Sequence, residues 1–293
     1  MPIFETPASI VATISLEAGN LRITASDRTD TVVEVRPSKA SAAADVRAAE
    51  ETLVEYAEGR LSVKAPKSKT RSWLRRGASI EVTIDLPTDS RVEVDAVAGD
   101  LRAEGRLGES AFETVSGDIR VDLSGGLRLK TVSGDVAVAR SVGRTDVTTA
   151  NGDVRIGEVE GAAVARTVSG DITVGTVTGD LRLDTTNGDI SVDRALAGVS
   201  ARTQCGDVRI GEVVRGSVVL ETASGDLEVG IREGSAAWLD ASSQHGDVRR
   251  RLAECACPDR SDDTVELRAR THHGDITISR SVSADRPHHL AEA

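Results

Sequence analysis

The chain has 293 residues, a formal net charge of −11 at pH 7, and only 2% aromatic residues against 39% hydrophobic residues in all. The negative charge argues against a protein that neutralises a nucleic-acid backbone, and the scarcity of rings removes the stacking platforms of single-strand binders. In addition, no run of 18 apolar residues occurs, which a membrane-spanning helix would need. The sequence therefore predicts neither a nucleic-acid partner nor a membrane span.

The N-terminal residues 1–19 have no basic segment, and polar residues break their apolar run, unlike the core of a secretory signal. Three cysteines are too few, and odd in number, for a disulfide framework. Together these features predict a cytoplasmic location.

Residues 1–95 hold several segments in which polar and apolar residues alternate, as in strands with one buried face. Those segments are 10–16, 21–24, 31–36, 61–65 and 80–86. Residues 41–56 are rich in Ala and Glu without Gly or Pro, which predicts a helix. We predict that residues 1–95 form a β-rich cap, with a helix near 41–56, over the open end of the repeats that follow. The basic segment 64–76, which contains Trp73, is either a solvated loop or a partner contact.

From residue 96 onward a Gly-Asp pair recurs at steps of 17 to 19 residues, with wider last steps of 21 and 28. The glycines of these pairs are Gly99, Gly117, Gly134, Gly152, Gly170, Gly188, Gly206, Gly225, Gly246 and Gly274. From the second pair on, a Thr or Ser stands three residues before each glycine, and Val, Ile or Leu follows every Asp. A shortened form of the phrase, Gly19-Asn20-Leu21, occurs near the N-terminus. A repeat of this length predicts stacked units that each bury a face against their neighbours.

A second glycine column lies about half a period before the Gly-Asp pairs, so each unit has two corners. Between the corners apolar and polar residues alternate with period two, which predicts strands. We therefore predict an all-β fold, a parallel β-solenoid of about ten 18-residue coils over residues 96–280, which at ~4.8 Å per coil is a rod of about 50 Å. Residues 281–293 lack the periodicity and are predicted to be disordered.

The column of aspartates is the first candidate site. Carboxylates ~4.8 Å apart repel by roughly 1 kcal/mol each in water, so something must offset the repulsion. In one interpretation each Asp accepts backbone N–H groups at its corner, and arginines two residues further on neutralise the row. In the alternative the row binds calcium, as glycine-aspartate repeats of β-rolls do. The candidate calcium ligands are Asp118, Asp135, Asp153, Asp171, Asp189 and Asp207.

A second candidate is a zinc site formed by His245 and His273, with Cys255 and Cys257 as further ligands. The insertion at 252–264, which carries both cysteines, leaves the chain about five strand residues, or roughly 16 Å, from the histidines. The alternative is a stacked histidine pair beside a solvated loop, and we expect no bound metal ion.

Every candidate acid belongs to a repeat column, and no nucleophile elbow, phosphate-binding loop or dinucleotide fingerprint is present. The sequence therefore predicts no enzyme and no cofactor.

The phrase Thr-Val-Ser-Gly-Asp followed by Ile or Val, at 114–121, 131–138 and 167–174, resembles a bacterial family known as "putative adhesin" or β-strand-repeat protein, of unknown function and common in actinobacteria. The resemblance covers residues 95–280 and implies a β-solenoid without catalytic residues. Our first hypothesis is a scaffold that binds a protein partner or associates with itself. The alternatives are a calcium-dependent surface-binding module and an acidic rod that mimics DNA.

Overall fold

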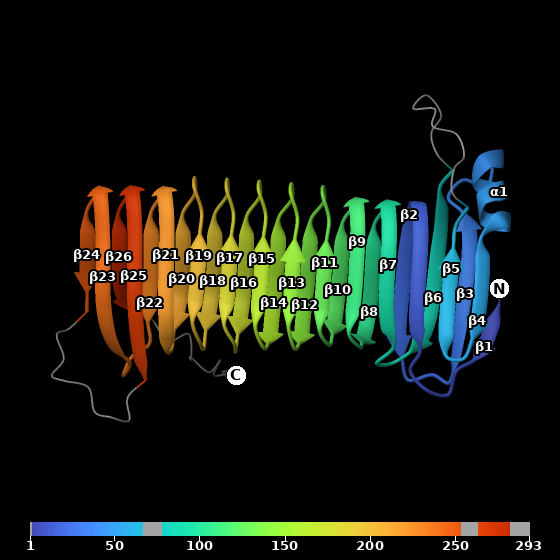
Figure 1. Ribbon diagram of the computed structural model, residues 1–293, viewed down its shortest axis with the longest axis horizontal. Coiled ribbons are helices and arrows are strands. Elements are labelled where there is room, and N and C mark those ends of the chain that lie inside the picture. Colours follow the sequence, from blue (N-terminus) through green and yellow to red (C-terminus); the bar gives the residue numbers. More distant parts are fainter. Residues whose placement is uncertain (1, 67–77, 253–262, 282–293) are drawn as a thin grey trace, which may run out of the picture.

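The computed structural model describes residues 2–66, 78–252 and 263–281, and in this part the chain forms one helix and 26 strands. The strands stack along one axis into a long rod with two facing sheets (Figure 1). The predicted all-β parallel solenoid is confirmed. None of the helical residues that the structure describes forms a segment long and apolar enough to cross a membrane.

The first sheet lies along one side of the rod. From the N-terminal end it runs β1 (Ile3–Glu5), β3 (Asp30–Pro37), β6 (Ile80–Pro87), β2 (Val11–Ser26), β8 (Leu101–Leu107), β10 (Ile119–Ser124), β12 (Val136–Val142), β14 (Val154–Glu160), β16 (Ile172–Val177), β18 (Ile190–Ala195), β20 (Val208–Val213), β22 (Leu227–Ile231), β26 (Ile276–Arg280) and β24 (Val248–Arg251).

The second sheet faces the first and shares the long strand β2 with it. It runs β4 (Leu53–Ala57), β5 (Arg60–Lys64), β2, β7 (Arg91–Ala98), β9 (Ser110–Ser116), β11 (Leu127–Lys130), β13 (Thr145–Thr148), β15 (Ala163–Arg166), β17 (Leu181–Asp184), β19 (Val199–Arg202), β21 (Gly216–Ser224), β25 (Thr264–His273) and β23 (Ala236–His245). All pairings are parallel except β1–β3, β3–β6 and β4–β5.

The core is a set of aliphatic columns between the two sheets. Val136 lies opposite Val154, and Val154 opposite Ile172, in a register that repeats from layer to layer. These side chains are buried, as are Val138, Ile156 and Val174, two residues further along each strand. The regular register explains the scarcity of rings, because identical layers leave room only for small branched side chains of matching size.

The N-terminal region caps one end of the rod. Helix α1 (Ala43–Glu51) packs on β3 and β6. In the same region the rings of Phe4 on β1 and Tyr56 on β4 lie 5.2 Å apart. The helix is shorter than the predicted 41–56, because residues 53–57 alternate in polarity and pair with β5 as strand β4.

The parallel stack includes β2 and therefore begins at Val11, well before residue 96. At its middle Gly19 takes a φ of +134°, and the side chain of Asn20 accepts a hydrogen bond from the backbone N–H of Asp100 at 3.2 Å. The shortened motif thus builds a corner like the others. The division of the chain into a cap over 1–95 and repeats over 96–280 stays a prediction, and the tail from 282 on lies outside the described residues.

Both ends of the stack depart from sequence order. Strand β2 is flanked by β5 and β6 on one side and by β7 and β8 on the other. At the opposite end β25 and β26, the last strands of the chain, lie between β21–β22 and β23–β24. The outermost layer at this end is therefore β23–β24, an internal segment.

Candidate interaction surfaces

The Gly-Asp corner requires glycine because two backbones meet there. Gly170 has a φ of +143°, and a Cβ at this position would lie 2.2 Å from the carbonyl oxygen of Gly152. The same geometry recurs along the column. Each corner therefore stacks directly on the one before it, and the residue after each glycine projects from the same edge of the rod.

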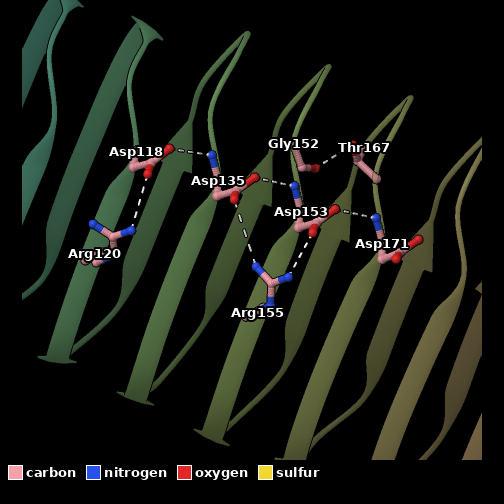
Figure 2. Close-up of polar contacts among 8 residues, drawn as sticks. All are labelled: Asp118, Arg120, Asp135, Gly152, Asp153, Arg155, Thr167 and Asp171. Atoms are coloured by element: carbon pink, nitrogen blue, oxygen red, sulfur yellow. Dashed lines mark hydrogen bonds and ion pairs between the residues drawn. The ribbon is translucent and has the colours of Figure 1, made fainter.

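The aspartates of this edge form a continuous hydrogen-bonded ladder (Figure 2). One carboxylate oxygen, Oδ1, of each Asp accepts a hydrogen bond from the backbone N–H of the Asp one layer further on. The bond from Asp171 N–H to Asp153 is 3.0 Å long, and that from Asp189 N–H to Asp171 is 2.8 Å. All six predicted residues take part in this ladder: Asp118, Asp135, Asp153, Asp171, Asp189 and Asp207. The interpretation in which each Asp accepts a backbone N–H is confirmed.

Arginines accompany the second carboxylate oxygen. Arg155 donates to Oδ2 of Asp153 at 2.8 Å and lies 4.0 Å from Oδ2 of Asp135, so that it links two layers (Figure 2). Arg120 and Arg249 make the same short contact with the Asp two residues before them. These pairs are exposed, and each contributes only about 0–1 kcal/mol. Their main effect is to lower the repulsion along the row.

Buried threonine hydroxyls hold the corner from the inside. Thr167 donates to the carbonyl of Gly152 at 3.4 Å, and Thr203 donates to that of Gly188 at 3.1 Å. Thr149 occupies the same column, yet its buried hydroxyl has no hydrogen-bond partner. The column therefore offers a direct comparison of a satisfied and an unsatisfied hydroxyl within one fold.

Within residues 2–66, 78–252 and 263–281, no three His, Cys, Asp or Glu side chains are grouped so as to hold a metal ion. In the Asp row one oxygen of each carboxylate is bonded to a peptide N–H. Calcium binding by the row stays a prediction.

His245 and His273 do lie together. Their rings stack with centroids 4.7 Å apart and an interplanar angle of 6°. The Nδ1 atom of His245 lies 3.3 Å from the carbonyl oxygen of His272. The stacked-pair interpretation is confirmed. The zinc hypothesis stays a prediction, because Cys255 and Cys257 lie outside the described residues. Most of the basic segment 64–76, including Trp73, also lies outside them.

On each broad face of the rod, ion pairs link residues of neighbouring layers. Arg194 pairs with Glu212 at 2.9 Å on the first sheet, and Arg202 pairs with Glu221 at 3.0 Å on the second. An open depression of about 400 Å³ on the first sheet is lined by charged residues, Arg102, Arg155 and Asp193 among them, and by small residues such as Gly157 and Gly175.

An exposed apolar ridge runs beside the Asp ladder, and the sequence analysis missed it. It consists of Val97, Val115, Val132 and Val168, each about half exposed, with Ala150 in the same column. Each of these residues follows a buried residue, which is Ala96 before Val97 and a threonine in the other coils, so the strand alternation directs them outward. The signal was present in the Thr-Val-Ser phrase, where an apolar residue occupies an outward position.

The part of the chain that forms the stacked layers matches a known protein family. The model of one family, Toastrack DUF4097, matches residues 12–215 and again residues 175–281. The chain belongs to this family. The resemblance drawn from the Thr-Val-Ser-Gly-Asp phrase is confirmed, and the match extends into the N-terminal region as far as β2.

Three solved structures are similar to this Toastrack chain. A putative adhesin from Bacteroides fragilis has 14% identity and a TM-score of 0.41, over 94% of this chain and 95% of that one. A putative cell adhesion protein from Clostridium sporogenes has 12% identity and a TM-score of 0.23, over 95% and 98%. A putative adhesin from Parabacteroides distasonis has 11% identity and a TM-score of 0.35, over 94% and 95%. The comparison with curated proteins gives no match.

Proposed function

We propose that this Toastrack protein is a non-catalytic scaffold, a rigid rod that acts by associating with further copies of itself. The observation that carries the proposal is that the repeated polar groups of the rod bond to one another. The Asp ladder and the threonine hydroxyls bond one layer to the next, and Arg155 bridges the aspartates of two layers. A surface built from such repeats supplies stiffness and contact area rather than a reactive centre. The adhesin names of the similar solved structures support the same class.

The test is the oligomeric state of the full-length wild-type protein as its concentration is raised. Light scattering should report a mass that increases with concentration, and electron microscopy should show particles larger than one rod. A single monomeric species at every concentration would contradict the self-association that the proposal requires.

We also propose a cytoplasmic location. Cys205 lies exposed at a corner as a free thiol, which suits a reducing compartment. Fractionation of the native cell tests this, and recovery outside the cytoplasm would contradict it. The DNA-mimic alternative stays a prediction that rests on the net charge of −11.

A further inference from the structure

The apolar ridge beside the Asp ladder runs without a break through five successive layers. Its residues stack in register, since Ala98 pairs with Ser116 beside the first two valines and the following positions pair from layer to layer. At ~4.8 Å per layer the ridge is about 19 Å long. Exposed apolar residues of soluble proteins are normally scattered singly, and a contiguous row of them is typical of an interaction surface.

The fold does not require valine in this row. In the next two layers Thr186 and Gln204 take the same position, and the residues beside them, Asn187 and Cys205, pair as those of the ridge do. The same layers thus form with a polar side chain in this place, so the stacking of layers does not explain the valines.

The ridge presents a rigid surface. From Val115 to Val168 the backbone carbonyl of each ridge residue accepts a hydrogen bond of 2.9–3.0 Å from the layer that follows. Because these carbonyls are already paired, contact with another molecule is left to the side chains. The branched side chain of valine is stiff, so little conformational freedom is lost when it is covered.

The charges beside the ridge change sign along it. The outward residues two positions before the ridge residues are, from layer to layer, Asp95, Glu113, Lys130, Thr148 and Arg166. The residues on the other side, directly after the ridge residues, are uncharged: Ala98, Ser116, Ser133, Asn151 and Ser169. The row beside the ridge is therefore acidic at one end and basic at the other.

Part of this row is already paired within the chain. Lys130 lies 2.6 Å from Glu113, and Arg166 shares the carboxylate of Asp184 with Arg182. Asp95 has no ion pair among the residues that the structure describes. An unpaired acid and an arginine with a shared partner therefore lie at opposite ends of the ridge.

We propose that two rods pair side by side through the ridge, in antiparallel directions and about a two-fold axis at Val132. This pairing rests on the proposed function and names the surface that serves it. The ridge residues of the two copies then lie opposite one another as Val132 with Val132, Val115 with Ala150, and Val97 with Val168. Because the axis closes the pair, growth beyond two rods needs a further contact, for which the edges of the end layers remain free.

The antiparallel direction follows from the charges. At both ends of the contact Asp95 of one copy faces Arg166 of the other, so that opposite charges meet. The two Asp ladders lie on the same side of the pair, but in the three middle layers arginines already lie within 4.0 Å of the carboxylates. From Asp171 to Asp226 the ladder has no such pair among the described residues. A parallel pair would instead bring Asp95 against the Asp ladder of the second copy.

A charge-swap experiment on the full-length protein tests the direction. Asp95→Arg and Arg166→Asp each place like charges opposite one another, so each variant alone should pair about 5-fold more weakly than the wild type in sedimentation velocity. An equimolar mixture of the two variants should recover the wild-type strength, as should the double variant, because opposite charges meet again. In a parallel pair Asp95→Arg would relieve repulsion and strengthen association, and this result would overturn the proposal.

Matched substitutions of exposed valines test the ridge itself. Val115→Thr with Val132→Thr keeps β-branched side chains but makes the centre of the ridge polar, and should weaken pairing about 10-fold or more. Val142→Thr is the control, because Val142 is 47% exposed like the ridge valines but lies at the other corner of its coil, and it should leave pairing unchanged. Urea unfolding checks that the variants are equally folded.

The outcomes separate this contact from the scaffold function. If the wild type associates and the ridge variant does so equally well, the side-by-side proposal is overturned while the scaffold function stands. The same holds if the ridge variant is weakened and the charge variants are not, because the direction is then wrong. A wild type that never associates would overturn both.

Discussion

A single methyl group at the Gly-Asp corner should disrupt the stacking of two layers. In Gly170→Ala the new Cβ would lie 2.2 Å from the carbonyl oxygen of Gly152 and 2.6 Å from its carbonyl carbon, both backbone atoms that cannot rotate away. The residue would also keep a φ of +143°, which an L side chain rarely adopts. Backbone strain of about 1–3 kcal/mol and overpacking of about 1–3 kcal/mol together predict a loss of about 2–6 kcal/mol in the free energy of unfolding.

Gly234→Ala is the matched control. Gly234 has a φ of +88°, and nothing lies within 4 Å of its added Cβ, so this variant should lose only about 1–2 kcal/mol from backbone strain. Urea unfolding followed by far-UV circular dichroism measures both, and hydrogen exchange shows whether the loss is local to the layers around residue 170. Equal destabilisation of the two variants would refute the reasoning, because it would mean that close stacking of corners adds nothing beyond the φ angle.

Two pairs of substitutions test the rest of the corner, and a fifth substitution tests an ion pair in the N-terminal region. Asp171→Ala removes the acceptor for the next layer's N–H and should lower the free energy of unfolding by about 0.5–1.5 kcal/mol, whereas Asp171→Asn keeps the oxygen and should be nearly neutral in urea unfolding. Thr203→Val loses a hydrogen bond and should cost about 1 kcal/mol, while Thr149→Val removes a hydroxyl without a partner and should be neutral or stabilising. The hydrogen bond from Arg28 lowers the pKa of Asp30, so its stabilising effect is present at neutral pH and is lost as the pH falls through that lowered value. NMR titration should find the pKa of Asp30 raised in Arg28→Ala, and an unchanged value would contradict the assignment.

The layers of the rod could be predicted from the sequence because the residues that shape a coil lie within that coil and recur in every coil. Glycine at the corner, threonine three residues before it and a branched apolar residue after the Asp all act within one coil, and the register of about 18 residues then places equal residues opposite one another. The ladder of aspartates follows as well, since the stacking of equal corners brings each carboxylate next to the N–H of the Asp one layer away.

The ends could not be predicted in the same way, because they depend on which distant segments pair. Strand β25 pairs with both β21 and β23, so that residue 271 lies between residues 222 and 243. Nothing in the local pattern distinguishes this order from a sequential one, since every coil offers the same edge to its neighbour. The exposure of Trp238 was missed for the same reason: it is a property of the outermost layer, not of its own coil.

The exchanged order of layers has a consequence for association. The terminal layer of a stack has only one neighbour, and a layer that also contained the free chain end would fray into solvent. Here the last strands of the chain are buried between two layers, and the exposed layer β23–β24 is joined to the rest of the chain on both sides. An edge held in this way loses less conformational freedom when it binds than a frayed one does. Removing residues 264–281 should therefore weaken self-association, because among the described residues β23–β24 pairs with no other layer. Sedimentation velocity of the truncated chain checks this, and association at wild-type strength would show that neither the buried last coil nor the edge it supports is part of the contact.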